Sequence, residues 1–242
     1  MKLYIDAVCV STSVSLDRFD LPLLKLLAKN QVIAQWQYQQ DEDEGNCLET
    51  AINLLHSYLT EIGQPVHLIG HGISGCLAFL YAQKFPSLVK SLSLLSVGVF
   101  PSLTWHSHYY AKRRLLPCSQ SVILLQLVQN LFGEKNIYRA KILAELLAKD
   151  LRRSLCPHSL IQQFRLEARQ VSIPLMIANS RDDRVLGELD TNGWLYWLKP
   201  QDLLWQVEAG QHFFHYANPQ LVSGRIQAFW QSQVCVRPLK SH

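Results

Sequence analysis

Three separated segments of the chain carry residue types that cooperate in acyl transfer. Gly70-His71-Gly72-Ile73-Ser74-Gly75, Arg181-Asp182-Asp183 and Gln211-His212-Phe213 each follow an apolar run. In acyl transfer, a histidine that is oriented by a carboxylate activates a hydroxyl or thiol, which attacks the acyl carbon. The segments would supply nucleophile, acid and base in that order, but glycine stands where the nucleophile would be.

The glycine-rich segment lies in the context of a sharp strand-to-helix turn. The strand-like run Val66-His67-Leu68-Ile69 precedes it, and a helix-like run from Ile73 to Phe85 follows and is closed by Pro86. This is the context that a nucleophile elbow requires. The chain thereby resembles the α/β-hydrolase superfamily and is identified as a degenerate member with Gly72 in the nucleophile position. Counted from Gly72, Ala78 and Ala82 fall where that family packs small residues against its sheet.

Glycine at position 72 excludes covalent catalysis from the elbow, because it has no side chain. It also relieves a strained backbone conformation that costs other residues about 1 to 3 kcal/mol. A second reading takes Gly72-Ile73-Ser74-Gly75-Cys76 as the motif, with Ser74 as the nucleophile, but it shifts the helix markers by two places. Otherwise Ser74 is a small residue that lets helix and strand approach. A serine-to-glycine substitution made to trap a substrate would give the same sequence.

The resemblance implies an acid and a base for the other two segments. Asp182 takes the family's acid position, with Asp183 as its neighbour, and His212 takes the position of the base. Asp182 would fix the tautomer of His212, or the pair would simply hold two loops together. The backbone N–H of Ile73 is expected to face a bound anion or carbonyl oxygen, and His71 to position the turn beside the ligand. The family's His-Gly pair after the first strand is missing, so the second oxyanion donor is in doubt.

The alternation of strand-like and helix-like runs predicts an α/β fold with a mostly parallel sheet covered by helices on both faces. A single α/β-hydrolase domain is expected over 1–242, with a helical cap inserted at about 99–170, where leucine-rich helical segments replace the strand pattern. The expected strands lie near residues 3–10, 31–36, 66–70, 89–96, 174–179 and 203–208.

The start of the cap mixes aromatic and cationic residues. Such a segment can contact a membrane interface or grip an anionic group, or it can be a cap helix with buried aromatics and a solvated basic face. The residues expected to carry an interaction are Trp105, Tyr109, Tyr110, Lys112, Arg113 and Arg114.

Composition narrows the class of protein further. A net charge of +4 over 242 residues is too small to indicate nucleic-acid binding. The six cysteines form no C-x-x-C pair, which is typical of reduced thiols. No apolar run reaches about 18 residues, so a cytoplasmic protein is expected, with peripheral membrane contact left open. No cofactor is expected, and neither His106 with His108 nor His212 with His215 has the nearby carboxylate or cysteine that a metal site needs.

Two functions follow from these observations. The first is a ligand- or partner-binding protein without serine-hydrolase activity, for a small apolar or acyl-type ligand or a protein partner. The alternative is a hydrolase of ester, thioester or amide bonds that uses Ser74, or a water activated by His212, together with Asp182. The first interpretation is preferred, and whether the protein is an enzyme stays open at this point.

Overall fold

The computed structural model describes residues 4–39, 45, 47–100, 104–155 and 170–234. Six parallel strands form one sheet in the order β2-β1-β3-β4-β5-β6. The strands are β1 (Ala7–Ser11), β2 (Ile33–Gln37), β3 (Val66–His71), β4 (Val89–Leu95), β5 (Leu175–Ser180) and β6 (Leu203–Val207). The predicted fold class is therefore confirmed, although β1 begins four residues later than the expected strand at residues 3–10.

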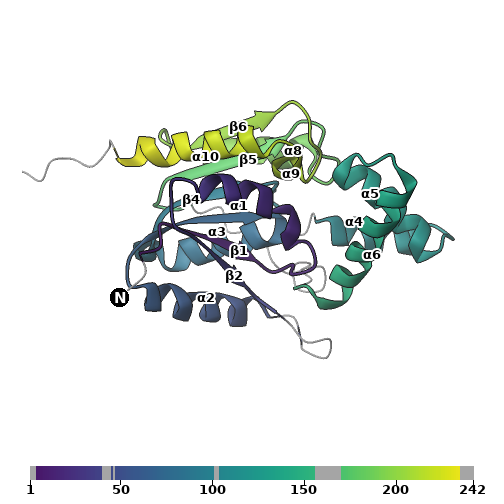
Figure 1. Ribbon diagram of the computed structural model, residues 1–242, viewed down its shortest axis with the longest axis horizontal. Helices are drawn as coiled ribbons and strands as arrows, with labels where there is room; N and C mark the ends of the chain where they lie inside the picture. The colour runs from purple at the N-terminus through teal and green to yellow at the C-terminus, as the bar shows by residue number, and fades with distance from the viewer. Residues whose placement is uncertain (1–3, 40–44, 46, 101–103, 156–169, 235–242) are drawn as a thin grey trace, which may run out of the picture.

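Helices cover both faces of this sheet (Figure 1). Side chains alternate along the strands: Val8 and Val10 of β1 pack into one core, whereas Ala7 packs into the other. The first core lies under α2 (Leu48–Ile62), α3 (Gly72–Lys84) and the region of α8 (Glu188–Gly193), and the second lies under α1 (Leu21–Leu27) and α10 (Pro219–Val234). The short α9 (Phe214–Ala217) lies beside α10. Three 3₁₀ turns complete this part of the structure: η1 (Asp17–Phe19), η2 (Pro86–Leu88) and η3 (Trp194–Tyr196).

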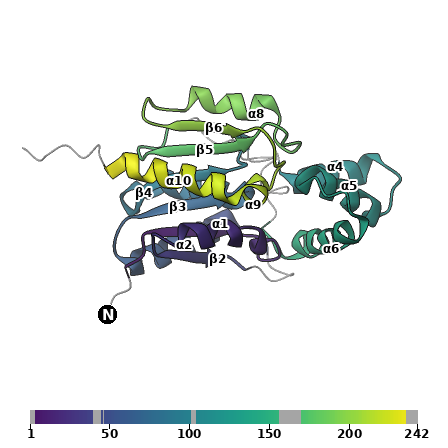
Figure 2. The same cartoon turned by 45° about the horizontal axis from the view of Figure 1, so that its top comes forward.

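Three further helices form a separate layer at one end of the sheet, which we call the cap helices: α4 (Trp105–Leu115), α5 (Gln120–Phe132) and α6 (Ile137–Arg153). They lie beyond the carboxyl ends of the strands (Figures 1 and 2). Each begins at a polar residue whose side chain accepts a backbone N–H: Thr104, Ser119 and Asn136. Their inner sides share an apolar core with residues of the sheet domain, including Phe19 and Phe213.

No helix among the described residues is long and apolar enough to cross a bilayer. Figure 2 shows that the cap helices leave the edges of the sheet uncovered and stand only at its carboxyl end. In a parallel sheet this is the edge where loops after successive strands meet, and where ligand sites form. The loops after β1, β3, β5 and β6 therefore converge beneath the cap helices.

Candidate active site

Gly72 stands at the end of β3 with a left-handed backbone, at φ +52°. A Cβ built on Gly72 would lie 3.7 Å from Nε2 of His212, which is its one contact within 4 Å, apart from its chain neighbours and its own helix, among the residues that the structure describes. The turn is tightened by a second contact, because a Cβ on Gly70 would lie only 2.5 Å from Cα of Gly75. The chain thus builds a sharp elbow and aims a histidine at the place where a nucleophile's side chain would begin.

His212 is held by Asp183 and not by Asp182, so the predicted acid is wrong by one residue. Nδ1 of His212 lies 2.9 Å from Oδ2 of Asp183, and both side chains are buried. The other oxygen of Asp183 accepts the backbone N–H groups of Val185 and Leu186, at 2.8 and 3.2 Å. Burial raises the pKa of Asp183, but His212 and these backbone donors outweigh it and bring the pKa below its ordinary value.

Asp182 instead organises the loop that carries His212. Its Oδ1 accepts the backbone N–H groups of Gly210 and Gln211, at 3.1 and 2.8 Å, and its Oδ2 accepts the Gln211 side-chain amide at 2.7 Å. Gly210 and Gln211 both have positive φ, at 141° and 52°. The carboxylate therefore stabilises an unusual backbone through charge-assisted hydrogen bonds, and through that backbone it positions His212.

The tautomer of His212 follows from its partner. An ionised carboxylate only accepts hydrogen bonds, so Nδ1 carries a proton, and in the neutral ring Nε2 then presents its lone pair toward Gly72. This is the arrangement that a general base needs. The backbone carbonyl of His212 is fixed as well, because it accepts from Nε2 of His71 at 3.0 Å and from Oγ of Ser96 at 2.8 Å.

His71 positions the loop and does not titrate in the ordinary range. Burial lowers its pKa well below 6.5, and the nearby His215 and His212 lower it further. Its Nε2 must carry a proton, since the carbonyl of His212 can only accept. His71 also lines the cavity described below, so its ring forms part of the wall while its N–H is committed to the His212 loop.

The donors expected to bind an oxyanion are only partly in place. Ile73 lies in the first turn of α3 and lines the cavity. In the loop after β1, the N–H of Thr12 is donated to Oγ of Ser74 at 3.0 Å, and the N–H of Ser13 to Oγ of Ser11 at 3.2 Å. Side-chain hydroxyls therefore occupy the backbone donors that a substrate oxygen would need.

Ser74 is a poor nucleophile in this arrangement. Its buried hydroxyl lies within hydrogen-bond distance of both the N–H and Oγ1 of Thr12, and the histidine Nε2 is aimed at Gly72. The close approach of helix and strand that the sequence attributed to Ser74 is made by Gly75 against Gly70. Ser74 instead links α3 to the loop after β1.

A cavity of about 50 Å³ lies between the elbow, the loop after β1 and α4. One water needs about 10 to 15 Å³ of such space, so the cavity admits a group of a few non-hydrogen atoms. No Lys or Arg lines it among the described residues. Its lining includes the carboxylates Asp17 and Asp20, the imidazoles His71, His106 and His212, and the apolar side chains Leu16, Ile73, Val97, Phe100, Trp105 and Phe213.

Asp17 is a buried carboxyl in this wall that the sequence analysis did not single out. Its oxygens accept from Oγ of Ser11 and from the side-chain amide of Gln37. Burial raises its pKa from 3.8 to about 6, the charges of Asp20 and Asp150 add to the effect, and the two hydrogen bonds oppose it.

This carboxyl predicts how stability depends on pH. Between pH 3.8 and about 6 the folded protein binds more protons at Asp17 than the unfolded chain, so its contribution to stability falls as pH rises through that window and is constant above it. Asp17→Asn should therefore gain in melting temperature relative to the wild type across the window. Thermal melts at a series of pH values test this. Glu61→Gln, which removes an exposed carboxyl from α2, is the control for loss of a carboxyl.

A second histidine–carboxylate pair faces the same cavity from the cap. Nε2 of His106 in α4 lies 3.3 Å from Oδ2 of Asp150 in α6, and both residues are buried. Asp150 also accepts from Oγ of Ser13 and Oγ of Ser154, which ties α6 to the loop after β1. The 3.3 Å contact does not have hydrogen-bond geometry, and neither ring nitrogen of His106 has a hydrogen-bond partner among the described residues. The sequence showed His106 only as part of a rejected metal motif, since Asp150 is 44 positions away.

Two of the three aromatic residues expected to form a surface at the start of the cap are buried, which corrects part of the sequence-based expectation. Trp105 is 5% exposed and Tyr109 is 6% exposed, and both belong to the core of the cap helices. Tyr110 and the cations of this segment remain nearer to solvent, although Lys112 bonds to Gln126. Helical periodicity turns one side of α4 inward, so aromatics and cations that adjoin in sequence point to different environments.

Two cyanobacterial proteins align with nearly the whole chain. The uncharacterized protein sll0249 of Synechocystis sp. (strain PCC 6803) is 40% identical over 225 residues, which is 93% of this chain and 90% of that protein. The uncharacterized protein alr2406 of Nostoc sp. (strain PCC 7120) is 40% identical over 227 residues, covering 94% and 91%. No protein-family model matches.

Solved structures resemble the fold at low sequence identity. The carboxylesterase CesB from Bacillus subtilis superposes with a TM-score of 0.72 at 12% identity, covering 95% of this chain and 84% of that one. A membrane phospholipase A described as a bacterial virulence factor gives 0.71 at 18%, covering 95% and 79%. The type II thioesterase BorB from the borrelidin biosynthetic cluster gives 0.63 at 17%, covering 96% and 93%. These likenesses establish the architecture.

Proposed function

We propose that the cavity of this chain, which belongs to the α/β-hydrolase superfamily, binds a small neutral acyl-type ligand without forming a covalent adduct. The chain also belongs to one family with sll0249 and alr2406. The observation that carries this proposal is the elbow itself. Gly72 leaves open the space 3.7 Å from Nε2 of His212, where a nucleophile would stand. The cavity therefore keeps the shape of an acyl site without the group that attacks.

The wall of the cavity supports a neutral ligand. Asp17 and Asp20 contribute negative charge, and no cationic side chain balances them among the described lining residues. A carboxylate or phosphate inside the cavity would lose its hydration and meet like charge, which is unfavourable on both counts. The apolar lining suits an acyl chain, and N–H of Ile73 together with the imidazole of His106 suits its oxygens.

The blocked donors argue against turnover. Removing one oxyanion donor from a serine hydrolase costs about 10² to 10³ in rate, and here the N–H of Thr12 is already committed to Ser74. The loss of the nucleophile and of this donor together would leave binding as the remaining function of the site. Both features, the glycine at position 72 and the occupied N–H of Thr12, lie in a site where Asp183 still orients His212.

One observation favours a second candidate, which is hydrolysis by activated water. His212 keeps the tautomer and orientation of a general base because Asp183 and the loop at Asp182 hold it there. A water in the space beside Gly72 would meet its Nε2 lone pair. In this candidate the water replaces the missing hydroxyl, and the ester is cleaved without an acyl-enzyme.

Ligand-observed NMR with the purified chain distinguishes the two candidates. Ethyl acetate is expected to bind and to remain intact, whereas acetate is expected not to bind, because only the neutral molecule avoids repulsion from Asp17 and Asp20. A fluorophosphonate probe should leave the protein unlabelled. Hydrolysis that disappears in His212→Asn would favour the water-activated candidate, and equal binding of acetate would contradict the neutral-ligand proposal.

Gly72→Ala is the matched variant for binding. Its methyl group enters the cavity 3.7 Å from Nε2 of His212 and should weaken the ester signal. Gly224→Ala adds a methyl group on α10 where nothing lies within 4 Å, and it should leave binding unchanged. An ester signal that survives in Gly72→Ala would show that the ligand occupies another place.

A further inference from the structure

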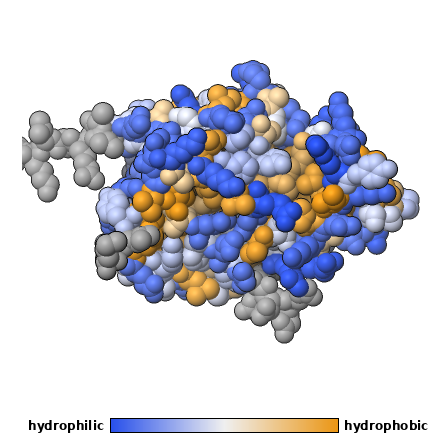
Figure 3. All heavy atoms as spheres, in the orientation of Figure 1, coloured by the Kyte–Doolittle hydropathy of each residue, from blue (hydrophilic) through white to orange (hydrophobic). Residues whose placement is uncertain are grey.

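The outer side of the cap helices combines exposed apolar and cationic side chains. Seven of the seventeen exposed large hydrophobic residues in the described part of the chain lie between Tyr110 and Ile142. Figure 3 shows apolar and hydrophilic side chains intermixed over the end of the molecule where these helices stand. We call this surface the cap pole and define its apolar members as Leu115, Leu116, Val122, Ile137, Tyr138 and Ile142.

The cap helices are also the most basic part of the chain. Residues 105–153, all of them described, include nine Lys and Arg and three acidic residues, whereas the whole chain has 23 and 19. Of the three acids, Asp150 is fully buried and Glu134 lies 4.0 Å from Arg139. Eight of the nine cations are exposed, as is the remaining acid, Glu145. The positive charge of the protein is therefore concentrated on the cap helices.

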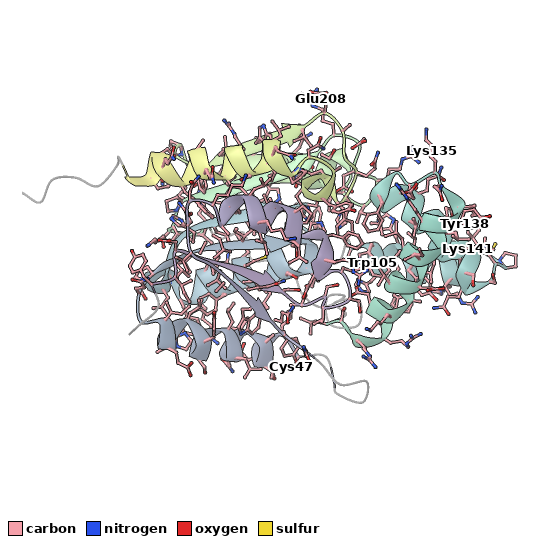
Figure 4. The ribbon with its side chains drawn as sticks, viewed as in Figure 1. Cys47, Trp105, Lys135, Tyr138, Lys141 and Glu208 are labelled. Atoms are coloured by element: carbon pink, nitrogen blue, oxygen red, sulfur yellow. The ribbon has the colours of Figure 1, made fainter. Side chains whose placement is uncertain are left out.

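The inner sides of the cap helices pack into a core, whereas their outer sides are exposed to solvent. Ala140, Ala144 and Leu147 of α6 pack inward, while Tyr138 and Ile142 point outward and are 76% and 58% exposed. Figure 4 places Trp105 at the junction with the sheet, Tyr138 and Lys141 on the outer side of the cap helices, and Lys135 at their upper side. The outward apolar side chains thus contribute nothing to the core that the structure describes.

We infer that the cap pole docks on an anionic lipid bilayer. Side chains such as Tyr138 and Ile142 can enter the headgroup region, while the exposed Lys141 of α6 and Lys135 just before α6 meet lipid phosphates. Charge complementarity selects the bilayer, because the cap helices carry eight exposed cations and one exposed acid. The inference is independent of the ligand in the cavity and differs from the sequence-based segment, since Trp105 and Tyr109 are buried.

Vesicle flotation with the full chain tests this surface. The protein should bind vesicles of equal phosphatidylcholine and phosphatidylglycerol more tightly than phosphatidylcholine vesicles, and less tightly as salt rises. Lys135→Gln with Lys141→Gln should weaken binding about 25-fold, at about fivefold for each lysine near an anionic surface. Tyr138→Ser with Ile142→Ser should weaken it by roughly tenfold or more through lost apolar burial.

Matched variants on other surfaces make the result specific. Lys25→Gln with Lys29→Gln, on α1 and just after it, and Leu195→Ser with Tyr196→Ser, on η3, change equally exposed residues and should leave binding unchanged. Circular dichroism and melting temperature establish that all four variants are folded. Equal binding to neutral vesicles, or equal losses in the control variants, would overturn the inference. The inference would also be overturned if the protein forms a dimer in solution and the double variant Tyr138→Ser, Ile142→Ser is monomeric, because a second copy would then cover the cap pole.

Discussion

Gly72→Ser is expected to convert an unreactive protein into one that a fluorophosphonate probe labels at residue 72. A Cβ at this position lies 3.7 Å from Nε2 of His212, so the new hydroxyl comes within reach of this nitrogen, while Nδ1 is held by Asp183. The variant should lose about 1 to 2 kcal/mol of stability, since φ at position 72 is +52° and a side chain disfavours that conformation. Mass spectrometry of the labelled peptide measures the first effect, and thermal melts measure the second.

Gly72→Ala separates chemistry from strain in this experiment. It carries the same backbone penalty without a hydroxyl, so it should match the stability of Gly72→Ser and stay unlabelled. Adding His212→Asn to Gly72→Ser should abolish labelling. If Gly72→Ser is folded and remains unlabelled, His212 is not positioned as a base in solution.

The hydroxyl of Ser74 should limit the esterase activity of Gly72→Ser, because it occupies a backbone N–H that could otherwise bind the substrate oxygen. Since Oγ of Ser74 accepts the N–H of Thr12, adding Ser74→Ala should release that donor for a substrate oxygen. Ester hydrolysis by the double variant should then exceed that of Gly72→Ser by up to about 10². Ser93→Ala, a buried serine of β4, is the control for removal of a hydroxyl and should give no gain.

Gly70→Ala is expected to be the most destabilising single methyl addition in the elbow. Its Cβ would lie 2.5 Å from Cα and 2.6 Å from N of Gly75, which are backbone atoms that cannot rotate away. Strand and helix would have to separate, at a cost of about 3 kcal/mol or more. For a chain of this size that corresponds to a fall in melting temperature of roughly 6 to 12 °C or more.

Gly224→Ala is the opposite case. Nothing lies within 4 Å of a Cβ at this position of α10, and alanine is favoured over glycine inside a helix by about 0.5 to 1 kcal/mol. The melting temperature should therefore rise slightly.

A Gly70→Ala protein as stable as the wild type would show that the strand and the helix do not approach each other this closely.

The architecture could be predicted because its signals are local. Apolar runs of strand length, the glycines around position 72 and the proline that closes α3 all lie within short stretches of sequence. Most strand limits agree within two residues, and the elbow lies where the motif predicts it. The order of nucleophile position, acid loop and base also holds, since loops at the carboxyl ends of parallel strands meet at one edge.

The identity of the acid was decided only by tertiary structure. Asp182 and Asp183 adjoin, but one turns to the amides of Gly210 and Gln211 and the other to the ring of His212. A difference of one residue at the end of a strand reverses the direction of a side chain, and composition cannot show which direction the loop takes.

The sequence by itself therefore determined the fold, the glycine at the elbow and the presence of a histidine and a carboxylate for the site. Only the tertiary structure decided that Asp183 orients His212, that Ser74 occupies the N–H of Thr12, and that Trp105 belongs to a core. It also brought His106 and Asp17 to one cavity from segments about ninety positions apart. Local patterns depend on neighbours along the chain, whereas these contacts depend on how distant segments meet, which the packing of the whole chain sets.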